Sequence, residues 1–320
     1  MASSGRRVSA SRLRRALTPW LFLAPSLGGV AVFMGFPFLD VLSRSFRDAM
    51  GTRLVGLDNY KAVLDNSAFR LAAGNTVRFL AVCIPLLLVL SLSLALLLTK
   101  RAEIYGKLPA DSGDRGGCRL IRTTMVLPMA VPAASMVLIW KILLCPEGVL
   151  NQALTAATGE PWETDWAFSP WAFPVLVVTY LWKHTGYDMI LWVAGLQGIS
   201  GDLYEAARID GAGAWQELRY ITLPQLGGTF CLVGILSLVN SFRVYREAYL
   251  LAGSYPDSSI YLIPHLFAHW FLNLDVQKMT AAAVMMTGVF LAPALAGRIV
   301  QRKIGREKIG RKKVRGGERM

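Results

Sequence analysis

Long runs of apolar residues alternate with shorter polar stretches along this 320-residue chain. Each run is long enough to cross a hydrocarbon core of roughly 30 Å as a helix that rises about 1.5 Å per residue. Backbone polar groups within lipid must be satisfied inside the segment, so a helix is the expected form of each run. The pattern predicts an all-α polytopic membrane protein with six transmembrane helices. These helices are expected at residues 18–43, 75–99, 121–144, 171–197, 226–250 and 279–298.

Composition agrees with this pattern and argues against a soluble domain. Apolar residues make up 54% of the chain and charged residues only 17%, whereas soluble domains carry about 25% charge. The chain contains the cysteines Cys83, Cys118, Cys145 and Cys231. No pair of these cysteines shares both an oxidising compartment and the spacing of metal ligands. Neither a disulfide nor a zinc site is therefore expected.

Basic residues gather in three stretches that lie on one side of the membrane if six helices alternate in direction. These stretches are 1–17, 100–119 and 299–320, whereas acidic residues such as Glu147 and Glu160 fall on the other side. The positive-inside rule then places both termini in the cytoplasm. The net charge of +13 is therefore interpreted as a topology signal and a contact with anionic membrane lipid, and no nucleic-acid partner is expected.

The same pattern divides the chain into segments. They are a basic cytoplasmic N-terminus, a first transmembrane helix, an outer loop, a five-helix core and a basic cytoplasmic tail. We place them at 1–17, 18–43, 44–74, 75–298 and 299–320, with a polar cytoplasmic loop at 199–225 inside the core. The loop at 100–119 is rich in glycine and charge, and the sequence assigns it no role.

The polar loop at 199–225 carries the most specific pattern in the chain. Asp202 and Glu205 have the spacing of a capping box, which predicts that a short helix begins there. Gly211 permits a turn that a side chain would obstruct. Pro224 fits the junction at which the loop ends and the fifth transmembrane helix begins. The loop is thus predicted to be a short helix, a turn and a second helical arm.

This segment resembles, almost position for position, the EAA loop of permease subunits from binding-protein-dependent ATP-binding-cassette (ABC) importers. In that family the loop is a cytoplasmic coupling helix that sits in a groove of the ATPase subunit. Gly228 stands where the family often has a second proline, so the fifth helix is expected to begin more flexibly. The positions that the resemblance assigns to ATPase coupling are Glu205, Ala206, Ala207, Asp210, Gly211, Ile221, Leu223 and Pro224.

Three further motifs are similar to the carbohydrate-uptake branch of that family. They are Val55 to Tyr60 followed by Asn75 and Thr76, Leu127 to Pro132, and Pro146 to Asn151. The resemblance covers residues 18 to 300 and implies the type I ABC importer permease fold, like the first permease of maltose and glycerol-3-phosphate systems. It implies a multi-pass protein of a bacterial or archaeal cell membrane.

The resemblance also implies partners. An extracytoplasmic binding protein would deliver a carbohydrate, a second permease subunit would complete the pathway, and separate P-loop ATPase subunits would hydrolyse ATP. The chain contains no Gly-x-x-x-x-Gly-Lys-Ser/Thr phosphate loop, which agrees with ATP being bound elsewhere. No enzymatic activity, catalytic residue or cofactor is expected of this chain.

Polar residues within the fourth and fifth runs are candidates for the solute pathway. A charge at the centre of a membrane helix costs about 2.5–3.5 kcal/mol on insertion scales, so such charges usually face a cavity or a partner. Lys183 and Asp188 are five residues apart, do not share one helix face, and are expected to meet groups on other helices. Two interpretations stay open, pathway lining and structural pairing, with Arg243 snorkelling to the interface in the second. The candidate lining residues are Trp182, Lys183, Tyr187, Asp188, Asn240, Arg243 and Tyr245.

His265 and His269 have the i, i+4 spacing of two metal ligands on one helix face. The residues between them include no glutamate and no third ligand is nearby, so a short interfacial helix is expected and a metal site is not.

Other classes of protein fit the chain less well. An ABC importer permease for a non-sugar solute would share the EAA segment, whereas a stand-alone secondary transporter would have no use for it. Asp210 to Ala214 has a superficial likeness to the start of the CDP-alcohol phosphotransferase motif. Trp215 occupies the arginine position of that motif and its downstream aspartates are absent, which argues against a membrane enzyme.

Overall fold

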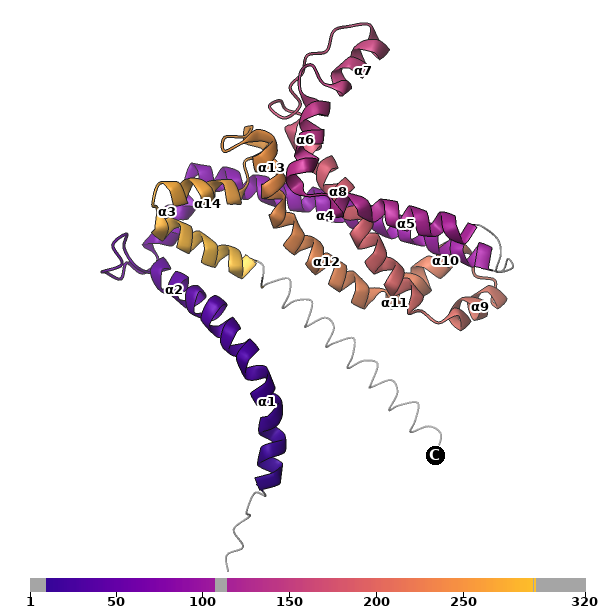
Figure 1. Cartoon of the computed structure of the whole chain (residues 1–320), viewed down its shortest axis with the longest axis horizontal. Coiled ribbons are helices and arrows are strands. Elements are labelled where there is room, and N and C mark those ends of the chain that lie inside the picture. Colours follow the sequence, from indigo (N-terminus) through magenta and orange to yellow (C-terminus); the bar gives the residue numbers. More distant parts are fainter. Residues whose placement is uncertain (1–9, 107–113, 290, 292–320) are drawn as a thin grey trace, which may run out of the picture. The chain divides into compact units, whose positions relative to one another are not determined.

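The structure is a computed structural model that describes residues 10–106, 114–289 and 291, with side chains from 18–99, 120–289 and 291 (Figure 1). Every named element in this part of the chain is a helix, which confirms the all-helical prediction. The N-terminal residues 1–9, the whole basic tail at 299–320 and residues 107–113 of the 100–119 loop lie outside the described part.

The chain forms two compact units. Unit 1 comprises Met1–Asn66 and Trp270–Leu291, and unit 2 comprises Ser67–His269 and Ala292–Met320. Four helical segments of the described residues are long and apolar enough to cross a membrane, namely Thr18–Ser45, Ser67–Thr99, Ala133–Thr158 and Gly227–Ala252.

Unit 1 begins with one long helical segment. Helix α1 (Ala10–Val30) continues through a π-helical turn, η1 (Ala31–Gly35), into α2 (Phe36–Ser45). The wider turn lies directly before Pro37. In a regular α-helix the Pro37 ring would clash with the carbonyl four residues earlier. In the wider turn the Phe36 N–H bonds to the carbonyl of Ala31, five residues earlier. None of the most apolar part of this segment is buried, as expected of a helix that faces lipid or another subunit.

A short polar connection ends the first helical segment. Asn59 Nδ2 donates to the carbonyls of Ser45 (2.9 Å) and Arg47 (2.7 Å), and Tyr60 Oη lies 2.8 Å from Ser45 Oγ. These bonds tie helix α3 (Asp58–Asp65) to the end of α2. The Asn59–Tyr60 part of the motif noted in the sequence therefore has a structural role. Residues 276–289 form the remaining helix of unit 1.

The core of unit 2 is built around helix α8, most of whose faces are buried. The 40-residue α4 and helix α5 both pack along α8, and α12 packs against α4 and α8 (Figure 1). Large side chains such as Tyr180 and Trp192 fill the contacts, and Trp192 Nε1 donates to Ser91 Oγ of α4 (3.0 Å). The bounds are α4 Ser67–Gly106, α5 Asp114–Ala130, α8 Ala172–Gln197 and α12 Gly227–Ser241.

The expected helix at 121–144 is broken in the structure. Helix α5 ends at Ala130, and α6 (Ala133–Leu144) begins after Pro132, whose ψ is 140°. Pro132 has no N–H to donate and disfavours helical backbone at Val131, which accounts for a break at this position. The short helix α7 (Val149–Thr158) follows Gly148.

Shorter helices complete unit 2 and lead back into unit 1. Between α8 and α12 lie α9 (Gly201–Ile209), α10 (Ala214–Glu217), η2 (Leu218–Thr222) and α11 (Leu223–Gln225). After α12 come η3 (Phe242–Val244), α13 (Tyr245–Ala252), η4 (Ser258–Ile260) and α14 (Ile263–Leu272).

Candidate functional site

The polar loop at 199–225 is a two-armed helical hairpin whose turn is set by Gly211. Gly211 has a φ of +80°, in the left-handed region that favours glycine. Its N–H bonds to the Arg208 carbonyl (3.1 Å) and the Ala212 N–H bonds to the Ala207 carbonyl (2.9 Å). This pair of bonds is a Schellman motif, which ends α9 and turns the chain into the second arm.

Three side-chain contacts stabilise the two arms. Arg208 Nε forms an ion pair with Glu217 Oε1 at 2.8 Å, and Tyr204 Oη lies 2.9 Å from Thr222 Oγ1. The Gly213 N–H donates to Gln216 Oε1 (2.7 Å) at the start of α10. Sequence reasoning did not single out these residues, because the pattern carries no signal for which side chains meet across the turn.

The start of α9 differs from the prediction. Ser200 occupies the cap position, Asp202 lies in the first turn, and the expected capping box of Asp202 with Glu205 is not formed. At α10 the Gln216 side chain accepts from the Gly213 N–H, which is one of the two bonds of a capping box; Gly213 has no side chain to make the other. Asp202 lies two residues past the cap position, so it is not the residue that caps α9.

The sequence-predicted coupling residues are brought onto this hairpin. Glu205, Ala206, Asp210, Gly211, Leu223 and Pro224 are exposed, and Ala207 and Ile221 are half-buried. Large apolar side chains in the same loop also face solvent, namely Ile209, Trp215 and Tyr220. Exposed apolar side chains on an ordered polar hairpin are typical of a surface that another protein covers.

A second group of polar residues lies between α8 and the α12–α13 segment. Lys183 of α8 forms an ion pair with Glu247 of α13. The buried Asp188 accepts a hydrogen bond from Ser237 Oγ (2.8 Å), and Tyr180 Oη donates to the Ser237 carbonyl (3.1 Å). Both charges in α8 thus meet groups on other helices, as the five-residue spacing predicted. Sequence reasoning missed Glu247 and Ser237.

The other candidate lining residues do not join this polar group. Trp182 packs its ring edge-on against Trp140 of α6, with centroids 5.9 Å apart. Tyr187 and Asn240 are half-buried, Arg243 is exposed, and Tyr245 contacts the ring of His265. A lining role for these residues stays a prediction.

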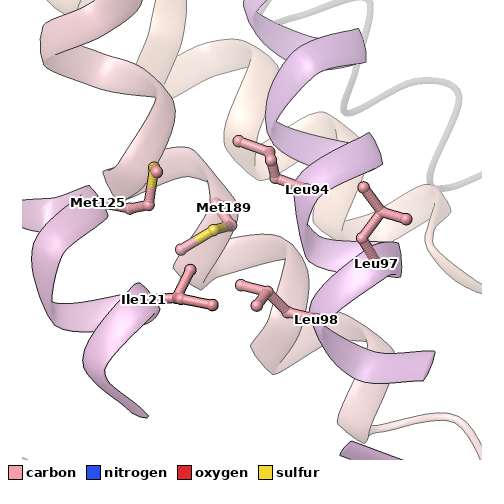
Figure 2. Close-up of a pocket in the computed structure, with 6 residues that line it drawn as sticks. All are labelled: Leu94, Leu97, Leu98, Ile121, Met125 and Met189. Atoms are coloured by element: carbon pink, nitrogen blue, oxygen red, sulfur yellow. The ribbon is translucent and has the colours of Figure 1, made fainter. Parts of the chain in front are cut away.

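A cavity of about 210 Å³ lies between α4, α5 and α8 (Figure 2). Its lining offers no group that could hydrogen-bond a hydroxyl, so it does not have the chemistry of a sugar site. The side chains around it are Leu94, Leu97, Leu98, Ile121, Met125 and Met189.

The histidines of α14 lie in a cluster of tyrosines. His265 Nδ1 accepts from the Leu262 N–H (3.2 Å), and His269 Nδ1 lies 2.9 Å from Tyr261 Oη. Burial lowers the pKa of His265 to about 4, with the nearby His269 adding to the effect. His265 is therefore neutral at physiological pH.

Apolar helices of membrane-spanning length, buried charges paired between helices, and an exposed polar hairpin together are typical of a polytopic membrane protein. The chain belongs to the family described as binding-protein-dependent transport system inner membrane component, which matches residues 110–308. The resemblance noted in the sequence is thereby confirmed. The family consists of transport permeases of the membrane and not of enzymes.

Relatives with assigned names cover most of the chain. The lactose transport system permease protein LacF of Rhizobium radiobacter is 32% identical over 75% of this chain and 78% of its own length. The trehalose/maltose transport system permease protein MalF of Thermococcus litoralis is 31% identical over 93% of this chain and 97% of its own.

Solved structures share the fold. A chain of a bacterial ABC transporter involved in the import of the acidic polysaccharide alginate superposes with a TM-score of 0.73 at 22% identity, over 92% of this chain and 99% of that one. A second structure is of a bacterial alginate ABC transporter in complex with an alginate pentasaccharide-bound periplasmic protein. It gives a TM-score of 0.74 at 21% identity, over 92% and 97% of the two chains.

Proposed function

We propose that this chain is a permease subunit of an ATP-driven ABC importer and forms part of the translocation pathway for a carbohydrate. The observation that carries the proposal is the α9–α10 hairpin, where a Schellman turn at Gly211 holds an exposed surface with Ile209 and Trp215 between two membrane helices. A separate cytoplasmic P-loop ATPase would bind this surface. A second permease and an extracytoplasmic solute-binding protein would complete the importer.

The proposed topology has six membrane crossings and cytoplasmic termini. The basic stretches at 1–17 and 299–320 support it through the positive-inside rule. The hairpin at 199–225 would then be cytoplasmic, and the connection 253–262 between α13 and α14 would be extracytoplasmic. A fluorescent protein fused after Met320 should fluoresce in cells, because such proteins mature in the cytoplasm; a dark but membrane-inserted fusion would contradict the topology.

A carbohydrate is the proposed solute because relatives that cover most of the chain are named for lactose and for trehalose or maltose. The motifs of the carbohydrate branch, such as Val55 to Tyr60, give independent support. The alternatives are a permease for a non-sugar solute and a stand-alone secondary transporter.

The proposal is tested by isolating the tagged chain from its native membrane in a mild detergent and identifying the accompanying proteins by mass spectrometry. Recovery of a P-loop ATPase, a second permease and a solute-binding protein is expected. The purified assembly is then reconstituted in liposomes and assayed for ATP-dependent uptake of labelled lactose, maltose and trehalose. Uptake without ATP by the chain alone would indicate a secondary transporter. ATP-driven uptake of a non-sugar solute, with none of the sugars, would overturn the carbohydrate assignment.

A further inference from the structure

Six tyrosine and histidine rings of unit 2 form one continuous series of contacts between α13, the connection 253–262 and α14. The centroids of neighbouring rings are 4.7 to 5.7 Å apart, a range in which aromatic rings attract each other. In order along the series the rings are Tyr255, His269, Tyr261, His265, Tyr245 and Tyr249.

Exposure changes steeply along this series. Tyr255 at one end is 81% exposed, whereas His265 in the middle is 1% exposed. The Tyr255 ring stacks on His269 with an interplanar angle of 29°. One face of Tyr255 is therefore covered by the imidazole, and the high exposure of the residue leaves the other face open.

The connection that carries Tyr255 is anchored. Asn75 Nδ2 of α4 donates to the carbonyls of Ser258 (2.6 Å) and Tyr261 (3.0 Å), and Thr76 Oγ1 accepts from the Ile263 N–H (3.2 Å). Asp257 caps the short helix η4 by accepting from the Ser259 N–H (2.8 Å). These bonds hold the connection in one conformation, so the ring series is presented without a large ordering cost.

Two polar atoms within the series are buried and have no hydrogen-bond partner among the residues that the structure describes. They are the Nε2 atoms of His265 and His269. Because His265 Nδ1 accepts from the Leu262 N–H, its neutral ring carries the proton on Nε2. Among the described residues the series therefore contains a buried donor without an acceptor, which is rare in native structures.

We propose that the open face of Tyr255 stacks one pyranose ring of the imported carbohydrate at the extracytoplasmic surface, and that the ring series continues inward from there towards Tyr245. The C–H face of a pyranose packs on the electron-rich face of an aromatic ring. The hydroxyls of the sugar then form hydrogen bonds with polar groups around that ring. Tyr255 is flanked in the sequence by Ser254, Pro256 and Asp257, so polar groups lie next to it. The proposal rests on the proposed function for its sugar and its topology.

The test uses the whole importer reconstituted in lipid nanodiscs without its binding protein, with maltose, lactose and trehalose as probes. Saturation-transfer NMR, with saturation of the aromatic protons, should show transfer to pyranose ring protons in the wild type. Tyr255→Ala and Tyr255→Leu should lose this transfer, and Tyr255→Phe should keep it because the stacking face is retained. Phe168→Ala is the matched control, since Phe168 is another exposed aromatic residue (54%) on the same proposed side of the membrane.

Uptake by proteoliposomes with the binding protein present gives a second readout. Tyr255→Ala should lower kcat/KM for sugar roughly three- to tenfold, as expected for the loss of one stacking contact, while Phe168→Ala stays within about twofold. Equal transfer or equal uptake in Tyr255→Ala and the wild type would overturn the stacking site and leave the proposed function intact. A wild-type importer that hydrolyses ATP but takes up none of the sugars would overturn both.

Discussion

Lys183 of α8 and Glu247 of α13 form an ion pair in which the two side chains are only 14% and 8% exposed. The residues are 64 positions apart in the chain, so the pair forms only when α8 and α13 pack together. A buried charge needs such a partner because removal from water is expensive, and more so inside a membrane.

Breaking this pair should destabilise the protein. Lys183→Met leaves the Glu247 carboxylate buried without its counter-charge, which costs about 3–5 kcal/mol. The Lys183→Met, Glu247→Leu double variant removes both charges and should recover most of the loss. Heating the detergent-solubilised protein and following the surviving monodisperse fraction by size exclusion measures the effect. A double variant no more stable than Lys183→Met would contradict the pairing.

Asp188 allows the two open interpretations of the membrane charges to be separated. If Asp188 lines the solute pathway, Asp188→Ala should change the solute-stimulated ATPase rate of the assembled importer. Ser237→Ala removes the 2.8 Å hydrogen bond to Asp188 but leaves the carboxylate, so it should have the smaller effect on this rate. If both variants lower thermal stability alike and leave turnover and solute range unchanged, the role of Asp188 is structural.

Gly211 should be essential for coupling to the ATPase. Gly211→Asp places a side chain and a negative charge on an exposed left-handed residue at φ +80°, a conformation that costs most L-residues about 1–2 kcal/mol and aspartate less, so the main change is the charge on the proposed ATPase-binding surface. Solute uptake by cells should be lost while membrane insertion, followed by immunoblot of the membrane fraction, stays normal. Gly213→Ala is the control, because its added Cβ would lie 3.9 Å from Gln216 Oε1 at a normal φ. Normal uptake in Gly211→Asp would refute the coupling assignment.

Gly186 should be required where α5 crosses α8. A Cβ at this position would lie 1.7 Å from the backbone carbonyl oxygen of Met125, so Gly186→Ala must push the two helices apart. Overpacking of this kind costs about 1–3 kcal/mol, and more where backbone must move. Gly234→Ala in α12 meets nothing within 4 Å and is the matched control. Comparing the thermal stability of the two purified variants tests the crossing, which an unaffected Gly186→Ala would disprove.

Local sequence signals predicted several features of the fold correctly. Gly211 was expected at a turn because only glycine adopts positive φ without strain, and the structure has it there. The break at Pro132 was not expected, because membrane helices often tolerate proline when neighbouring groups satisfy the freed carbonyls. Whether neighbouring groups satisfy those carbonyls depends on tertiary packing, which the sequence does not show. Asn75 and Thr76 were likewise noticed as a motif, but their anchoring of the 253–262 connection, more than 180 residues away, was not predictable.

The sequence by itself determined that the chain is a helical membrane permease, and it predicted a short helix, a turn and a second helical arm at 199–225. Hydropathy, proline and glycine act over a few neighbouring residues, so their consequences are written locally. Only the tertiary structure decided that Lys183 meets Glu247, that Asp188 meets Ser237, and that Tyr255 stacks on His269. Such contacts depend on which helix faces pack together. The apolar side chains that set this packing can replace one another in a hydrophobic pattern, so the pattern does not show which faces meet.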